Sequence, residues 1–108
     1  MKYNGKLVRT DLEGFLLDYK QWDIGMVIIL AKEENIELTD EHMEVIYFIR
    51  EFYKKFNISP TMRILVKAIE KVHGKTKGNS KYLFKLFKKG PAQQAAKLAG
   101  LPKPSRCL

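Results

Sequence analysis

The sequence is poor in cysteine: Cys107 is its only one among 108 residues. No disulfide can form within a single chain, which excludes the disulfide-stapled scaffolds of small secreted proteins. The longest unbroken apolar run, residues 26–31, is far shorter than the roughly 18 residues of a membrane-spanning helix. Residues 1–5 also lack the apolar stretch of a secretory signal. We therefore expect a cytoplasmic protein with no membrane contact.

Histidine is scarce as well, with His42 and His73 as the two examples. Neither shows metal-ligand spacing to the other or to Cys107, so no metal site is expected. We expect His42 at the surface near the start of a helix and His73 at a helix C-terminus, where the helix dipole favours it. No cysteine–histidine or carboxylate pair points to hydrolysis. The sequence therefore predicts a protein without a bound cofactor.

Charge is distributed unevenly along the chain. Residues 1–53 carry 6 basic and 11 acidic side chains, whereas residues 54–108 carry 14 basic and 1 acidic. The net charges of these halves are −5 and +13. A positive C-terminal half suits an acidic protein or a nucleic acid as partner. A solvated lysine-rich surface gives the same count, so charge alone leaves the partner open.

The pattern of apolar residues predicts a mainly α fold, a small helical bundle preceded by a short β-hairpin. Residues 1–10 form the hairpin around Asn4-Gly5, a dipeptide typical of type I′ turns. We expect Ser59 to cap the third helix and Pro60 to occupy its first position. The third and fourth helices could pair as a helix-turn-helix. The helices are expected at about residues 23–34, 39–56, 60–73, 79–88 and 91–98.

The pattern changes after residue 99. Pro102 and Pro104 favour an extended path without internal hydrogen bonds. At about 3 Å per residue, the last eight residues could reach roughly 25 Å from Gly100. We therefore expect a helical body over residues 1–99 and a mobile C-terminal arm over residues 100–108. Gly100 would be the hinge of this arm, and the two prolines would stiffen it.

The thiol of Cys107 lies near the end of this arm. Such a residue can be an incidental surface thiol. Lys103 and Arg106 favour the thiolate form and could help docking, while the terminal carboxylate of Leu108 opposes ionisation. A thiolate can attack a sulfane sulfur by the same exchange chemistry that governs disulfides. The hypothesis is that Cys107 carries sulfur as a persulfide.

Segments along almost the whole chain resemble the TusE/DsrC family. Its signature is strongest in the tail, Gly-Leu-Pro-Lys-Pro followed by a penultimate cysteine. The resemblance implies a helical body, an N-terminal hairpin, a mobile arm and a sulfur-relay role with Cys107 as the sulfur acceptor. The matching segments are residues 14–16, 21–22, 59–60, 63–67, 77–87, 90–92, 99–104 and 107–108.

The two branches of this family differ in their partners. In the TusE branch, the penultimate cysteine accepts sulfur from the TusBCD complex and passes it to the tRNA-thiolating enzyme MnmA, which makes 2-thiouridine at the wobble position. The DsrC branch, a partner of sulfite reductase, has a second cysteine eleven residues earlier. Ala96 stands at that position here. The resemblance therefore favours a TusE-like sulfurtransferase over a DsrC-like partner of sulfite reductase.

A basic helix-turn-helix protein that binds nucleic acid is the alternative from a different class. Lysine and arginine contacts to phosphate would give salt-dependent binding. Residues 80–88, however, offer mainly lysines and apolar side chains rather than groups that read base edges. Lys77 and Lys81 are candidate partner contacts. Arg63 could contact the arm or a partner, since the dipole does not favour a cation at a helix start; an ion pair with the acidic half is equally open.

Overall fold

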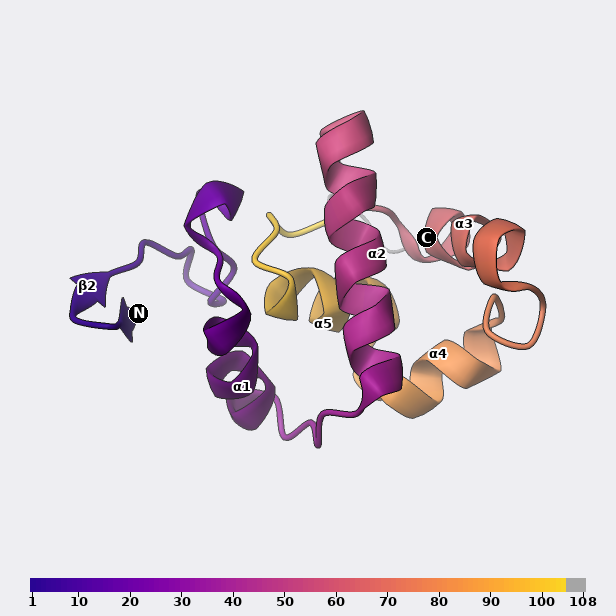
Figure 1. The fold of residues 1–108 in the computed structure, drawn as a ribbon, viewed down its shortest axis with the longest axis horizontal. Helices are drawn as coiled ribbons and strands as arrows, with labels where there is room; N and C mark the ends of the chain where they lie inside the picture. Colours follow the sequence, from indigo (N-terminus) through magenta and orange to yellow (C-terminus); the bar gives the residue numbers. More distant parts are fainter. Residues whose placement is uncertain (105–108) are drawn as a thin grey trace.

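The chain forms five α-helices, a 3-10 turn and a short hairpin within residues 1–104, which are the residues that this computed structural model describes (Figure 1). Arg106 and Cys107 lie outside the described residues. The prediction of a mainly α fold with an N-terminal hairpin is confirmed. The elements are β1 (Lys2–Tyr3), β2 (Lys6–Leu7), η1 (Tyr19–Gln21), α1 (Ile24–Glu33), α2 (Asp40–Phe56), α3 (Met62–His73), α4 (Ser80–Leu86) and α5 (Pro91–Leu98).

The hairpin follows from its two turn residues. Asn4 and Gly5 have φ angles of 50° and 76°, the positive values that a type I′ turn requires. The antiparallel strands β1 and β2 place Tyr3 opposite Lys6. The Tyr3 hydroxyl donates a hydrogen bond of 2.9 Å to the carboxylate of Asp23. This contact ties the hairpin to the start of α1, since two short strands are only marginally stable alone.

Three of the helices begin at a residue whose side chain caps them. Asp23, Thr39 and Asn79 each accept a backbone N–H of the helix that follows. The prediction for α3 is wrong by two residues. Thr61 caps this helix and accepts the N–H of Ile64, while Ser59 and Pro60 precede it. The Ser59 hydroxyl instead donates to a distant carbonyl, described below, so it serves tertiary structure rather than the cap.

The prediction for His42 is half wrong. His42 does lie in the first turn of α2, but its side chain is buried rather than at the surface. Its Nδ1 lies 2.7 Å from the Thr39 hydroxyl and accepts the Thr39 N–H, and its Nε2 lies 2.7 Å from the carbonyl oxygen of Leu86. Because Nδ1 accepts, Nε2 carries the proton and donates to Leu86. The imidazole thus links the N-terminus of α2 to the end of α4.

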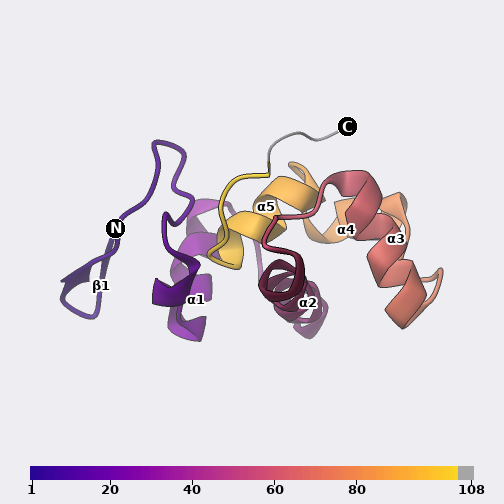
Figure 2. The same ribbon diagram turned by 90° about the horizontal axis from the view of Figure 1, so that it is seen from above.

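Helix α5 lies at the centre of the molecule, with the other four α-helices around it (Figures 1 and 2). Its alanines let neighbouring backbones approach closely, and it supplies the surface against which each other α-helix packs. No helix within residues 1–104 is long and apolar enough to cross a membrane. Six of the eight residues of α5 are buried: Pro91, Ala92, Gln94, Ala95, Ala96 and Leu98.

The loop between α3 and α4 lies directly on α3. A Cβ atom built on Gly78 would come within 2.2 Å of the Cα atom of Glu70, and such an approach is possible only without a side chain. Asn79 then begins α4 by capping it and by donating from its amide to the carbonyls of Lys75 and Thr76. The close turn between α3 and α4 therefore depends on glycine at this position.

We expect Gly78→Ala to lower the free energy of unfolding by more than about 2 kcal/mol, because the added methyl group meets backbone that cannot move aside. Urea unfolding followed by circular dichroism measures this. The matched control is Lys75→Ala in the same loop, at an exposed side chain, which should change stability by less than about 0.5 kcal/mol. Equal stability of Gly78→Ala and the control would contradict the close contact.

Candidate functional site

The described part of the arm, residues 100–104, lies against the body. Leu101 is fully buried, Pro104 is buried and Pro102 is partly covered, while Lys103 is exposed. Residues 101–104 belong to no helix or strand. The expected departure from the body at residue 100 is not what the structure has. Apolar burial of Leu101 keeps the chain on the body as far as Pro104.

The end of α5 explains why Gly100 is part of the body. The N–H of Gly100 donates to Lys97 and the N–H of Leu101 donates to Ala96, over 3.2 and 3.0 Å. With Gly100 at φ 69°, this pair of hydrogen bonds is a Schellman motif. A Cβ on Gly100 would also lie 2.4 Å from Cδ1 of Trp22. The geometry of Gly100 is therefore fixed by its contacts, which does not fit a freely turning hinge.

Two side chains from the N-terminal half pair with the last carbonyls of α5. The indole Nε1 of Trp22 donates to Leu98 over 2.9 Å, and Nη1 of Arg50 donates to Ala99 over 2.7 Å. Arg50 also donates to the carbonyl of Tyr19 and stacks on the Trp22 ring at 4.2 Å from its centroid. Burial lowers the pKa of Arg50, but guanidinium stays charged in proteins. A cation at this helix end also complements the helix dipole.

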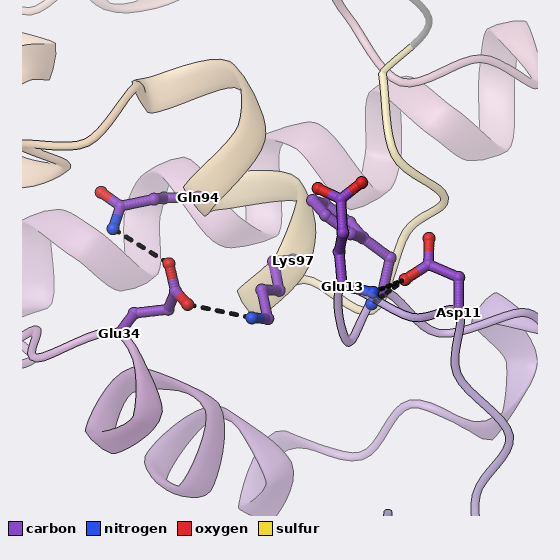
Figure 3. Close-up of polar contacts among 6 residues, drawn as sticks. Asp11, Glu13, Glu34, Gln94 and Lys97 are labelled. Atoms are coloured by element: carbon purple, nitrogen blue, oxygen red, sulfur yellow. Dashed lines mark hydrogen bonds and ion pairs between the residues drawn. The ribbon is translucent and has the colours of Figure 1, made fainter.

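Two further contacts hold the segment after Gly100. The Ser59 hydroxyl donates to the carbonyl of Pro102 over 2.7 Å, and the ammonium of Lys103 lies 2.7 Å from the carboxylate of Glu13. The carboxylate of Asp11 accepts the N–H of Glu13 and shapes the turn that presents it (Figure 3). We call Trp22, Arg50 and Ser59 the arm anchor, since each binds a carbonyl between residues 98 and 102. The positive charge of Lys103 is thus partly neutralised by the carboxylate of Glu13.

A second polar cluster joins the C-terminal end of α1 to α5. The carboxylate of Glu34 accepts hydrogen bonds from Gln94 at 3.1 Å and from Lys97 at 2.9 Å (Figure 3). Burial by itself would raise the pKa of Glu34, but these two donors outweigh it and lower the pKa below its ordinary value. Lys97 also lies beside Gly14, where a Cβ would come within 2.9 Å of its side chain. This ion pair therefore contributes to the packing of α1 against α5.

The three predicted partner contacts differ in their surroundings. Lys77 forms an ion pair of 2.8 Å with Glu44, which raises the pKa of Lys77. Arg63 and Lys81 are exposed. Arg63 makes no ion pair with any residue between 1 and 104, so the pairing with the acidic half that was open from the sequence is not formed there. Arg63 and Lys81 thus face solvent, whereas Lys77 is paired with Glu44 of α2.

The arm anchor is the part of the site that the sequence did not reveal. The sequence pattern places Trp22 in the family signature without indicating a contact for it. The pattern indicates no role for Arg50 or Ser59 in holding the arm. One signal was present: Arg50 follows the buried Ile46 by four residues, which places a cation at the edge of the apolar face of α2. A charged side chain in that position needs an acceptor inside the fold.

Comparison with known proteins assigns the family. Residues 2–108 match the family model described as DsrC like protein. The chain belongs to this DsrC-like family. Within it, the chain is 54% identical over 106 residues to "Sulfurtransferase TusE" of Photorhabdus laumondii, covering 98% of this chain and 96% of that protein. It is 50% identical over 106 residues to "Sulfurtransferase TusE" of Escherichia coli, covering 98% and 97%. The chain is accordingly a sulfurtransferase of the sulfur-relay type.

Solved DsrC structures share the fold. The solution structure of Allochromatium vinosum DsrC superposes with a TM-score of 0.89 at 47% identity, covering 100% of this chain and 96% of that chain. The crystal structure of the oxidized γ-subunit of dissimilatory sulfite reductase (DsrC) from Archaeoglobus fulgidus gives 0.82 at 39% identity, covering 99% and 97%. The arm anchor is therefore built on a fold common to the DsrC-like family.

We expect Arg50→Met to destabilise the protein by about 1–3 kcal/mol, because the Ala99 carbonyl loses its partner at a partly buried position. Trp22 is the only tryptophan, so its fluorescence reports the anchor directly. Emission should shift to longer wavelength and acrylamide quenching should increase as Gly100 and Arg50 separate from the ring. Arg63→Met, the same change at an exposed α3 position, should leave both signals unchanged; equal spectra for the two variants would contradict the anchor.

The lowered pKa of Glu34 predicts a pH-dependent contribution to stability. A carboxylate with a lowered folded-state pKa stabilises the protein above its ordinary value of 4.5 and loses that stabilisation as the pH falls through the folded-state pKa. Glu34→Gln should therefore cost about 1–3 kcal/mol at pH 7 and progressively less below pH 4.5. Denaturant unfolding at several pH values measures this. Glu33→Gln, at the exposed neighbour, should show no such dependence.

Proposed function

We propose that this protein carries sulfur as a persulfide on Cys107 in the cytoplasm, from a TusBCD-like donor complex to an MnmA-like enzyme that makes 2-thiouridine at the wobble position of tRNA. The observation that carries the proposal is the position of the only cysteine. It follows a segment held by the arm anchor and stands next to last in a chain whose relatives are named sulfurtransferases. No cofactor takes part in this chemistry.

Each transfer is a thiol–persulfide exchange. The Cys107 thiolate attacks the outer sulfur of a donor persulfide, the new S–S bond forms on Cys107, and the donor leaves as a thiolate. A cysteine thiolate of the acceptor then attacks the same outer sulfur and regenerates the Cys107 thiolate. Neither step has a net oxidant or reductant, since one S–S bond replaces another. Arg106 favours the thiolate that both steps need.

The anchored segment supports delivery over a short range. An extended chain covers at most about 3.6 Å per residue, so three residues beyond Pro104 carry the Cα atom of Cys107 no more than about 11 Å from that of Pro104. While the arm anchor holds, the active sites of both partners must come to the surface around Pro104. Gly100, Pro102, Lys103 and Pro104 then act by setting the point from which the thiol is presented.

The single cysteine also separates the two branches of the family. Identities of 54% and 50% to TusE proteins, against 47% to a DsrC structure, are too close to decide alone. The second cysteine that the resemblance assigns to DsrC is replaced by Ala96, which is fully buried in α5. A chain with one thiol cannot form an intramolecular disulfide or trisulfide. This supports the TusE-like role over partnership with a sulfite reductase.

We expect the reduced protein to gain about 32 Da, one sulfur atom, when incubated with a persulfide donor. Cys107→Ser should gain nothing, because a hydroxyl is not a nucleophile in this exchange. Intact-mass spectrometry under non-reducing conditions measures both. The matched control is Ser105→Ala, which keeps the thiol and should load like the wild type.

In cells, replacement of the gene by Cys107→Ser should abolish 2-thiouridine in tRNA, measured by nucleoside mass spectrometry, while Ser105→Ala should preserve it. Normal thiouridine levels with Cys107→Ser would refute the proposed relay. If the wild type gains sulfur in vitro but cells with Cys107→Ser keep normal thiouridine, the protein would be a persulfide carrier that serves a different acceptor. That outcome also contradicts the proposal.

A further inference from the structure

An open apolar groove lies between the C-terminal halves of α2 and α3. Its volume is about 600 Å³, and its floor and walls are mainly hydrocarbon. It lies apart from the arm anchor and from the polar cluster around Glu34. The residues that line it are Phe48, Glu51, Phe52, Lys55, Phe56, Ala68, Lys71 and Val72.

The apolar residues of the groove form two stripes. Phe48, Phe52 and Phe56 recur every four residues along α2, and Ala68 and Val72 do so along α3, so each set lies on one helix face. The outer end is open to solvent: Phe56 is 53% exposed and Val72 is 64% exposed. Two helical stripes that leave apolar area uncovered form the type of groove that binds an amphipathic helix.

The charges at the rim define the partner. Lys55 and Lys71 line the groove, and Lys67 lies one turn before Lys71 on α3. None of these three lysines makes an ion pair with any side chain in the described range, residues 1–104. The one acidic residue of the lining, Glu51, is already paired with Lys54. The rim therefore complements acidic side chains.

The α2 stripe of the groove leads along the chain toward the arm anchor. Phe56, at the end of its α2 stripe, precedes Ser59 by three residues, and Ser59 holds the carbonyl of Pro102. A molecule seated in the groove is therefore bound at the helix whose end leads into the arm anchor.

We propose that this groove is the docking site for an amphipathic helix of a partner protein, with apolar residues three or four apart and flanking aspartate or glutamate. Its assignment to the sulfur relay rests on the function proposed above, and the partner helix would belong to the MnmA-like acceptor or the TusBCD-like donor. The phenylalanine stripe and Val72 bind its apolar face, and Lys55, Lys67 and Lys71 bind its acidic flanks.

The first test measures binding to the purified MnmA-like enzyme and TusBCD-like complex of the same organism by calorimetry. Val72→Asp should raise the Kd for at least one of them by about tenfold or more, since it places a charge against the apolar face of the partner helix. Lys71→Glu should do the same and reduce the salt dependence of binding. Loading of Cys107 by a small persulfide donor should stay normal in both variants.

The controls are matched changes on α1. The side chain of Ile28 is 67% exposed, a fraction similar to the 64% of Val72. Lys32 is an exposed lysine on the same helix as Ile28. Ile28→Asp and Lys32→Glu should leave the Kd unchanged. If wild type passes sulfur to the acceptor and Val72→Asp does so with the same Kd and KM, the groove proposal fails while the relay stands. If Cys107→Ser cells keep thiouridine, the relay fails instead.

A second test needs no assumption about the relay. A photo-crosslinking amino acid at position 72, in the otherwise normal protein in cells, should give a cross-link that maps to an acidic amphipathic helix of another protein. The same residue at position 28 should not give that product. Cross-links only to a second copy of this chain, only to lipid or RNA, or none above the position 28 background would each overturn the proposal.

Discussion

The carbonyl groups at the end of α5 need hydrogen-bond donors that the surrounding core does not offer from its own apolar side chains. Helix α5 is covered by the other four α-helices, and an unpaired carbonyl in such a place costs about 1–3 kcal/mol. Trp22 and Arg50 supply the donors, and both come from the first half of the chain. The position of the arm is therefore a consequence of how the N-terminal half folds, and it cannot be separated from that half as an independent appendage.

Ion pairs also connect the two halves of unequal charge. The ion pairs Glu13–Lys103, Glu34–Lys97 and Glu44–Lys77 each join the acidic half to the basic half. Part of the charge of each half is thus neutralised by ion pairs within the molecule. The lysines that make no ion pair within residues 1–104 include Lys67 and Lys71, which lie beside an apolar groove. Net charge by itself predicted a basic surface; the pairing pattern decides which part of it is available.

Local chemistry was predictable from the sequence, whereas contacts between distant segments were not. The Asn4-Gly5 turn and the caps at Asp23, Thr39 and Asn79 depend on residues within a few positions of each other. The docking of the arm depends on Trp22, which lies 76 positions from its acceptor. The two prolines predicted that no helix continues after Gly100 but could not show that Leu101 is buried. The same limit applies to the imidazole of His42, whose acceptor is 44 positions away.

A carrier with one thiol must obtain its specificity away from the sulfur. A persulfide reacts with any accessible thiolate, and the exchange itself does not distinguish one acceptor from another. Because residues 100–104 are held on the body, the function proposed above requires a partner to approach the body surface near Pro104. Recognition by the body and delivery by the chain end are then one event, since a partner that does not fit the surface does not come within reach. In the proposed relay, an arm held at its base limits the range of the sulfur, and this limit would reduce its transfer to the wrong thiol.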